Sequence, residues 1–345
     1  MHVEKTNEKS ERTGMKPFNW GDISRFRSEM MGIAILLVIL RHVHYPIHDM
    51  SHGLWRCGAV GTEMFLFFSG MGCWFSWIRR PQLRRFLTRR YIRIYPIWLV
   101  VASIVFTNLY LNDKGYARNI PELLCEILFN YSYWSKGNWT FWFVPAIMMI
   151  YMFAPSYITL IRRNPRWKWI PAAVLLWCFV VEHVPPIHDA VGHLYRFWIG
   201  TFTFLLGINS AELVQSKHSL GKFSLIWVPL LLVASFFVCY EAHQRGIHPT
   251  PWFLHRALYL PLMFALVMTL TKALSIMPGS FNRILRFIGG ISLEIYLVHV
   301  ELIYRPLHRI CHGYWNNVLA VTLISVALAW LLHKILSQIT KHIPA

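Results

Sequence analysis

Long apolar stretches, separated by short polar segments, are the feature of this sequence that most restricts its fold. A transmembrane helix needs roughly 20 mostly apolar residues, and ten stretches of about that size follow one another along the 345-residue chain. The sequence therefore predicts an all-α protein, a polytopic integral membrane helix bundle with about ten transmembrane helices. The predicted spans are 30–48, 58–78, 91–112, 139–160, 169–184, 194–213, 223–241, 252–274, 285–304 and 316–338.

The net charge of +18, from 34 Lys and Arg against 16 Asp and Glu, indicates nucleic-acid binding, an acidic ligand or membrane topology. If the N-terminus is cytoplasmic, 24 of these 34 basic residues fall on the cytoplasmic side of the ten spans. Basic residues concentrate in cytoplasmic loops, so we expect both termini in the cytoplasm and no nucleic-acid partner. The predicted organisation is a cytoplasmic segment over residues 1–29, a transmembrane domain over 30–338 and a cytoplasmic tail over 339–345.

Ionisable residues within the first two spans are candidate functional residues, because charged groups inside a bilayer are costly. Arg41 and His42 end the apolar run of the first span, and Glu63 precedes an apolar run in the second. A carboxylate there needs a partner, and we expect it to be His42 or Arg41. Such a pair predicts His42 as a general base with Glu63 holding its tautomer. A buried ion pair that only joins two helices is an equal alternative.

Two arginines at the start of the third span form a second candidate site. Arg90 and Arg93 are three residues apart, so they share one face of a helix. Paired guanidinium groups suit bidentate phosphate binding. The alternative is a topology anchor that contacts lipid head groups.

The ninth predicted span carries a third set of polar side chains. Ser292, Tyr296 and His299 are spaced four and three residues apart, which places them in one stripe of a helix. The stripe indicates either the polar lining of a cavity or hydrogen bonding between helices. Gly289 and Gly290 precede it and would allow a close helix approach.

Two further hypotheses concern transport and metal binding. Polar residues inside a membrane are also expected of a transporter or channel with a proton or solute path, but the chain shows no inverted repeat. His44, His48 and His52 have a spacing that can hold a metal, but Pro46 interrupts the helix before His48. We therefore predict no metal site.

In their order along the chain, these elements resemble the acyltransferase 3 family, membrane enzymes that O-acylate bacterial surface sugars and related acceptors. The resemblance covers roughly residues 22–310. It rests on five elements: Glu29 to His42, Phe67-Phe68-Ser69-Gly70, Arg90 to Pro96, Trp142-Phe143 with Tyr151 and Pro155, and Gly290-Ile291-Ser292 with Tyr296 to His299.

The resemblance implies a donor and a catalytic base. His42 matches the histidine that deprotonates the acceptor hydroxyl, with Glu63 as a second polar group of the catalytic site. Arg90 and Arg93 match the arginines expected near acyl-CoA phosphates, and Ser69 matches a polar position of the second span and is expected to bind the donor as well. The expected donor is acyl-CoA, most often acetyl-CoA, and no permanently bound cofactor is expected. Direct attack and a transient acyl-histidine both remain open.

The resemblance also implies an acceptor site and a cellular location. Tyr296 and His299 match the family's late Tyr-Leu-x-His element, and with Arg41 they are expected to bind the acceptor. The expected acceptor is a glycan or glycolipid, the location is the inner (plasma) membrane, and membrane lipids surround the protein. One departure concerns Met31, which stands eleven residues before His42, where the family usually has Arg or Lys.

Overall fold

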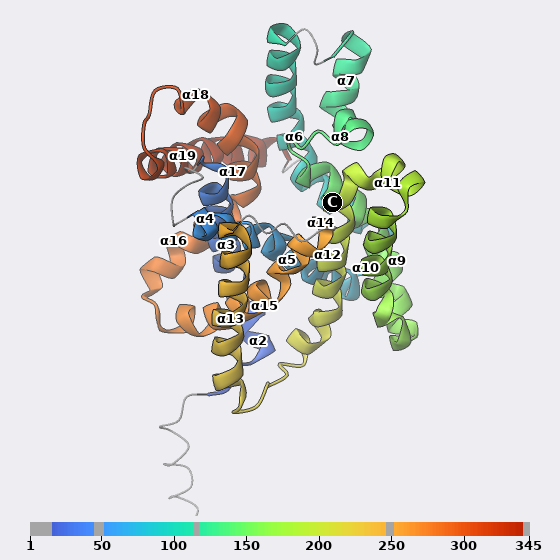
Figure 1. Cartoon of the computed structure of the whole chain (residues 1–345), viewed down its shortest axis with the longest axis vertical. Coiled ribbons are helices and arrows are strands. Elements are labelled where there is room, and N and C mark those ends of the chain that lie inside the picture. The colour runs from blue at the N-terminus through green and yellow to red at the C-terminus, as the bar shows by residue number, and fades with distance from the viewer. Residues whose placement is uncertain (1–15, 45–51, 114–116, 246–251, 341–345) are drawn as a thin grey trace, which may run out of the picture.

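The computed structural model describes residues 16–44, 52–113, 117–245 and 252–340, and this part of the chain is helical throughout, with one isolated β-bridge between Asn19 and Ser219 (Figure 1). The elements are α2 (Trp20–Arg25), α3 (Arg27–His42), α4 (His52–Cys57), α5 (Val60–Arg79), α6 (Leu83–Asn112), α7 (Ile120–Phe129), α8 (Tyr131–Lys136), α9 (Phe143–Arg163), η1 (Pro165–Trp169), α10 (Ile170–His183), α11 (Pro185–Val191), η2 (Gly192–Leu194), α12 (Tyr195–Gln215), α13 (Ser224–Gln244), α14 (Trp252–Ala257), α15 (Tyr259–Ile276), α16 (Gly279–Gly290), α17 (Ser292–Val298), η3 (His299–Tyr304), α18 (Arg305–Leu307) and α19 (Tyr314–Thr340).

Several of these helices can cross a membrane, as the sequence predicts. Six helices in the described ranges are long and apolar enough to do so, and the bent pair α16 and α17 makes a seventh if it counts as one span. The helices in the first and fifth predicted spans, α3 and α10, are shorter, with 16 and 14 residues. The protein is thus a multi-pass membrane helix bundle, while the count of about ten spans and the cytoplasmic termini stay predictions.

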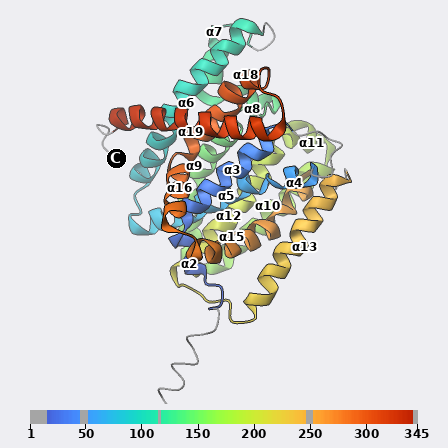
Figure 2. The same cartoon turned by 90° about the vertical axis from the view of Figure 1, so that its left-hand side faces the viewer.

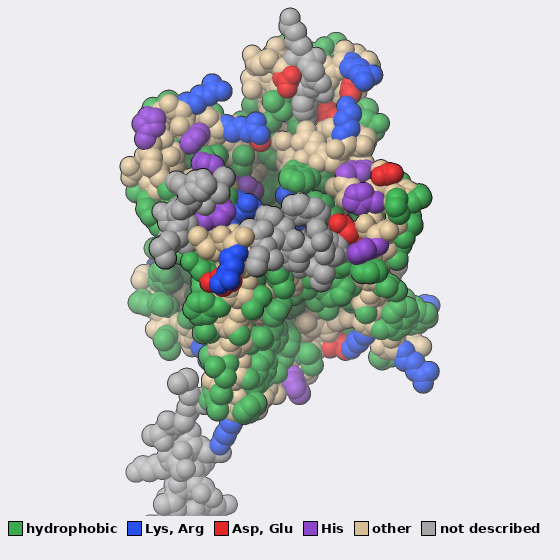
Figure 3. Space-filling model, in the orientation of Figure 1, with side chains coloured by type: hydrophobic (Ala, Val, Ile, Leu, Met, Phe, Trp, Pro, Cys, Tyr) green, Lys and Arg blue, Asp and Glu red, His purple; other side chains and the backbone are tan. Residues whose placement is uncertain are grey.

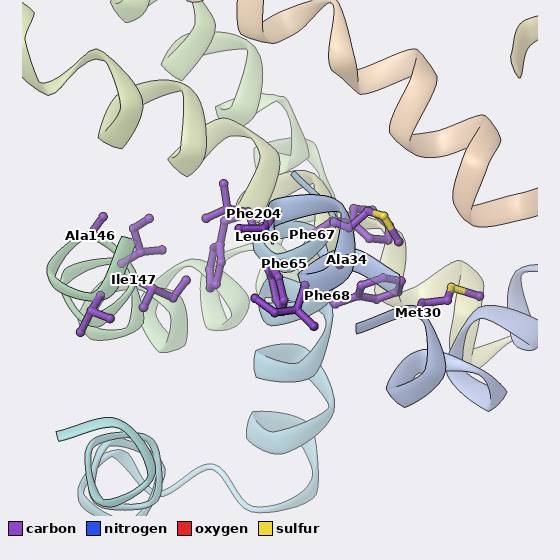
Figure 4. Close-up of a cluster of buried hydrophobic side chains, with 14 of the residues drawn as sticks. Met30, Ala34, Phe65, Leu66, Phe67, Phe68, Ala146, Ile147 and Phe204 are labelled. Atoms are coloured by element: carbon purple, nitrogen blue, oxygen red, sulfur yellow. The ribbon is translucent and has the colours of Figure 1, made fainter. Parts of the chain in front are cut away.

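Helices α3 and α5 lie at the centre of the bundle and run antiparallel. Gly61 near the start of α5 lies against Ala34 of α3, whereas Arg27 at the start of α3 reaches Phe68, further along α5. Fourteen of the 20 residues of α5 are buried, because neighbouring helices cover it on several sides. Figure 4 shows part of the resulting core: Met30 and Ala34 of α3, Phe65, Leu66, Phe67 and Phe68 of α5, Ala146 and Ile147 of α9, and Phe204 of α12.

Glycines set the closest helix approaches around this centre. A Cβ atom on Gly289 of α16 would lie 1.9 Å from the carbonyl oxygen of Ser28 on α3, and one on Gly70 of α5 would lie 2.0 Å from that of Phe204 on α12. Only a glycine fits at such positions. The close approach predicted at Gly289 is therefore confirmed, whereas Gly290 faces open space.

The C-terminal part of the bundle is broken and wraps around the centre. Helices α16 and α17 meet at a bend of 59°, and α17 passes at His299 into the π-helical segment η3. In Figure 2, α19 crosses over the bundle and α13 follows its outer edge. In an apolar stretch of 18 residues in each of these two helices, only 17% is buried inside the protein. Their exposed apolar faces are suited to contact with lipid chains.

Candidate active site

A cavity of about 650 Å³ lies beside α3 and is lined by side chains from most of the central helices. Basic and histidine side chains gather around the hollow in the upper half of the face drawn in Figure 3. Seven of the eight site residues predicted from the sequence line this cavity: Arg41, His42, Ser69, Arg90, Arg93, Tyr296 and His299. The structure thus brings together residues from four predicted spans.

The cavity extends along α3, so its length can be estimated from the residues of this helix that line it. Arg27 near the start of α3 and His42 at its end both line the cavity. They are 15 residues apart, about 22 Å at the rise of an α-helix. Seven arginines line its wall. Six of them form two groups, the proximal group of Arg27, Arg90 and Arg93 near the start of α3 and the distal group of Arg41, Arg196 and Arg256 near its end.

Backbone carbonyl groups of α5 hold the proximal group in place. Arg27 donates from Nη2 to the carbonyl oxygen of Phe68 at 3.2 Å, and Arg90 donates from Nη2 to that of Gly72 at 2.9 Å. Arg93 lies one turn beyond Arg90 and is exposed. Within the described residues, no carboxylate lies within ion-pair distance of these three arginines. The group therefore presents uncompensated positive charge to the cavity.

Arg27 is a member of this group that the sequence reasoning missed. It lies four residues before Met31, one helical turn away on the same face, and both side chains line the cavity. Arg41, in contrast, belongs to the other end of the cavity. The cation that Met31 does not supply is therefore available one turn earlier, from Arg27. This residue lies at the edge of the polar N-terminal segment, where no feature of the sequence distinguishes it.

His42 and His299 form a hydrogen-bonded pair, with 3.1 Å between Nδ1 of His42 and Nε2 of His299. Nδ1 of His42 also lies 2.9 Å from the carbonyl oxygen of Val38, and Nδ1 of His299 lies 2.8 Å from that of Tyr296. A carbonyl oxygen can only accept, so each Nδ1 carries the proton when the rings are neutral. The unprotonated Nε2 of His299 then accepts from Nδ1 of His42, and Nε2 of His42 keeps its lone pair.

The surroundings of the two histidines differ. His299 is 1% exposed and begins the π-helical segment η3, a distortion that often occurs at functional sites. His42 has an exposed side chain in the wall of the cavity. The buried ring can orient its neighbour, and the exposed ring can meet a substrate.

Glu63 has other partners than those expected. Its carboxylate is 1% exposed, pairs with Arg256 through both Nε and Nη2, and accepts a hydrogen bond from Oγ1 of Thr203 at 2.7 Å. The prediction that it pairs with His42 or Arg41 was wrong, because Arg256 on α14, 193 positions along the chain, occupies the carboxylate. Glu63 therefore supports the cavity wall through Arg256, whose side chain lines the cavity.

Aromatic rings support the distal group. The Arg196 guanidinium lies 4.0 Å from the centroid of Trp139 and 5.6 Å from that of Trp142, and Arg256 lies 5.4 Å from the same Trp142 ring. The sequence reasoning did not assign Arg196 or Arg256 to the site, although a cation inside an apolar stretch is itself the signal.

Tyr296 completes the centre of the site. Its hydroxyl oxygen accepts a hydrogen bond from the backbone N–H of Phe143 at 3.4 Å, so its own proton is free to be donated. Ser292 and His299 line the same cavity, which makes the predicted stripe part of its wall. Ser69 is 8% exposed and lines the cavity from α5.

The histidine cluster considered for metal binding falls partly outside the described residues. His48 lies in the segment 45–51, which the structure does not describe. The amide of His44 donates to the hydroxyl of Tyr304 at 2.8 Å, and His52 accepts from Arg56 at 3.3 Å. In the described ranges, no three His, Cys, Asp or Glu side chains gather as a metal site.

Comparison with known proteins agrees with the enzyme interpretation of this cavity. The family model described as an acyltransferase domain matches residues 30–334, which contain all eight predicted site residues. No curated protein and no solved structure matches the chain. The match covers nearly the whole sequence, and the chain therefore belongs to the acyltransferase 3 family of membrane acyltransferases.

Proposed function

We propose that the protein moves an acyl group, with acetyl as the expected group, from cytoplasmic acyl-CoA to a hydroxyl group of a glycan or lipid-linked sugar at the plasma membrane. The observation that carries this proposal is one continuous cavity with the three arginines of the proximal group at one end and His42 at the other. A base, an anion site and room for a long substrate are the parts that acyl transfer from a nucleotide thioester requires.

The proximal group supplies the donor site. CoA carries phosphates on its nucleotide, and Arg90 with Arg27 presents guanidinium groups that are fixed by backbone carbonyls. No carboxylate of the described ranges forms an ion pair with either of them. Fixed guanidinium groups bind phosphates with little further loss of side-chain freedom. The flexible arm of CoA then follows α3 toward His42, so that the thioester and the nucleotide occupy opposite ends of the cavity.

His42 supplies the base. Its Nε2 accepts the proton of the acceptor hydroxyl, the hydroxyl oxygen bonds to the thioester carbonyl carbon, and the carbon–sulfur bond then breaks. The proton passes from His42 to the departing CoA thiolate, so the enzyme returns to its starting state. His299 keeps Nε2 of His42 unprotonated through their hydrogen bond. The hydroxyl of Tyr296 donates to the oxygen that becomes negative during attack.

The test compares cells that produce the wild-type protein with cells that produce His42→Ala or His308→Ala. His308 is exposed and does not line the cavity, so it serves as a matched histidine control. Mass spectrometry of envelope glycans and glycolipids should show one added acyl group on a defined sugar in wild-type and His308→Ala cells. The His42→Ala cells should lose roughly 100-fold or more of this signal.

An immunoblot of the membrane fraction measures the amount of each variant. Equal amounts mean that the lost acylation reflects lost catalysis and not lost protein. Acylation retained by His42→Ala at the wild-type level would remove His42 as the base. A sugar mass that does not depend on the protein at all would contradict the proposed reaction. A positioning role for His299 predicts that His299→Asn lowers kcat and changes its pH profile while the KM for acetyl-CoA stays the same.

A further inference from the structure

The distal group carries more positive charge than the carboxylates of the described residues balance. Four arginines line this end of the cavity, the three of the distal group and Arg305. Glu63 pairs with Arg256 and Glu301 pairs with Arg305 at 3.0 Å. Among the described residues, no carboxylate lies within ion-pair distance of Arg41 or Arg196. Within this part of the chain, two guanidinium charges thus have no carboxylate partner and can bind a ligand in the cavity.

Both of these arginines are only partly exposed, and each lies over an indole ring. Arg41 lies 4.1 Å from the ring centroid of Trp55, and Arg196 lies 4.0 Å from that of Trp139. A cation over an aromatic face is stabilised modestly, and this contact does not use the N–H groups at the guanidinium edge. Arg196 donates from Nε to the hydroxyl of Tyr195 at 3.0 Å, which leaves its two terminal nitrogens to donate to a ligand. The two indole rings thus position two guanidinium groups whose remaining N–H donors can reach a ligand.

The ligand at this end differs from the donor nucleotide. The proximal group lies about 22 Å away along α3, and the thioester must reach His42, which is adjacent to Arg41 in the sequence. The distal arginines therefore lie beyond the reacting carbonyl, on the side from which the acceptor hydroxyl comes. Trp139, Trp142 and Asn138 line the cavity beside them and offer apolar faces and an amide, which suit a sugar ring.

We propose that the acceptor is an anionic sugar, with a phosphate or carboxylate group on the acylated residue or on the residue bonded to it, and that Arg41 and Arg196 bind this group. The inference rests on the proposed function and names its substrate class. With a neutral sugar, two partly buried cations would have no carboxylate partner among the described residues, which is unfavourable inside a membrane protein. An anion here also fixes which hydroxyl meets His42.

The first test uses wild-type protein and the acylated product itself. Envelope glycans and glycolipids from cells with wild-type protein or His42→Ala are fragmented and sequenced by tandem mass spectrometry, which places the acyl group on one sugar. The proposal expects a phosphate or a carboxylate on that sugar or its neighbour. Phosphatase treatment and carboxyl reduction of the fragment, followed by its mass, distinguish these two sources of charge.

The second test uses Arg196→Gln, with Arg162→Gln as an exposed arginine control outside the cavity. The acylated fraction of the same fragment should fall roughly tenfold or more in Arg196→Gln cells and stay at the wild-type level in Arg162→Gln cells. Binding of acetyl-CoA to the purified Arg196→Gln protein should stay within about twofold of wild type. This binding also shows that the variant is folded.

The outcomes separate the two proposals. An acylated sugar that is neutral and has neutral neighbours overturns the anionic acceptor while the acyltransferase reaction stands. Unchanged acylation in Arg196→Gln cells likewise overturns it. If no sugar shows His42-dependent acylation, the proposed function fails, and the acceptor assignment fails with it.

Discussion

The two ends of the cavity are both built from arginine, yet the protein holds the two groups in different ways. Arg27 and Arg90 of the proximal group donate to backbone carbonyls of α5, and no carboxylate among the described residues pairs with them. In the distal group, Arg256 is bound by the buried Glu63, and Arg196 lies over indole rings. One end thus keeps its full charge, and the other end is partly neutralised by the protein.

This difference indicates ligands of different charge. A carbonyl oxygen fixes a guanidinium group without cancelling its charge, which suits a ligand with several phosphate charges. A buried carboxylate such as Glu63 removes one charge from the distal group and leaves room for a ligand with a single anionic group and neutral surroundings. The comparison therefore predicts that substitutions at the two ends have separate effects on the two substrates.

The largest expected effect comes from removing the carboxylate that holds the distal group. Glu63→Gln leaves Arg256 as an uncompensated charge in a nearly buried place, where its side chain is 13% exposed. We expect a loss of about 3–5 kcal/mol in the free energy of unfolding, measured by thermal unfolding of the purified protein. Glu241→Gln is the matched control, because it breaks an exposed pair with Arg245 that contributes little. Equal stability of both variants would show that Glu63 does not hold the distal group.

A smaller effect is expected at the proximal group, and it should be limited to the donor. Arg90→Gln should raise the KM for acetyl-CoA roughly tenfold and leave the apparent KM for the acceptor unchanged. Arg89→Gln is the control, because Arg89 is exposed and does not line the cavity. Initial rates in membrane vesicles at varied acetyl-CoA give both constants. If Arg90→Gln changes the acceptor constant instead, the two ends have been assigned the wrong substrates.

The smallest effect tests whether Arg27 replaces the cation that the family usually has at the position of Met31. Arg27→Met should raise the KM for acetyl-CoA by roughly threefold to tenfold. The exchange variant Arg27→Met/Met31→Arg should recover part of this loss, because the two positions share one face of α3 one turn apart. The same kinetic assay measures both. A double variant no better than Arg27→Met alone would mean that the two positions are not equivalent.

The helical fold and the residues of the site could largely be predicted from the sequence, because apolar length and intramembrane polarity are local signals. His42, His299 and Arg90 were recognised one span at a time, and each lines the cavity. The number of spans is harder to predict. The central helix α5 is buried by its neighbours, so its composition need not meet the requirements of a lipid-facing span.

Pairings between distant helices could not be predicted. The sequence offered His42 and Arg41 as neighbours of Glu63, but the choice of Arg256 depends on how α14 packs against α12 and α15. Similarly, Arg27 stands in a polar segment where one more basic residue carries no signal. Its contact with Phe68 arises only because α3 and α5 run antiparallel.

The contact of Gly289 with Ser28 joins α16 to α3 at the opposite end of α3 from His42. The buried Glu29 strengthens this joint by accepting from Arg286 at 2.6 Å. The chain continues from α16 through a bend to His299, so the rings of His42 and His299 lie on helices that are joined at this one contact. The distance between His42 and His299 therefore depends on the space at Gly289, far from both rings. A methyl group in place of the Gly289 hydrogen atom would push α16 away from α3 and so shift the helices that carry the two histidines.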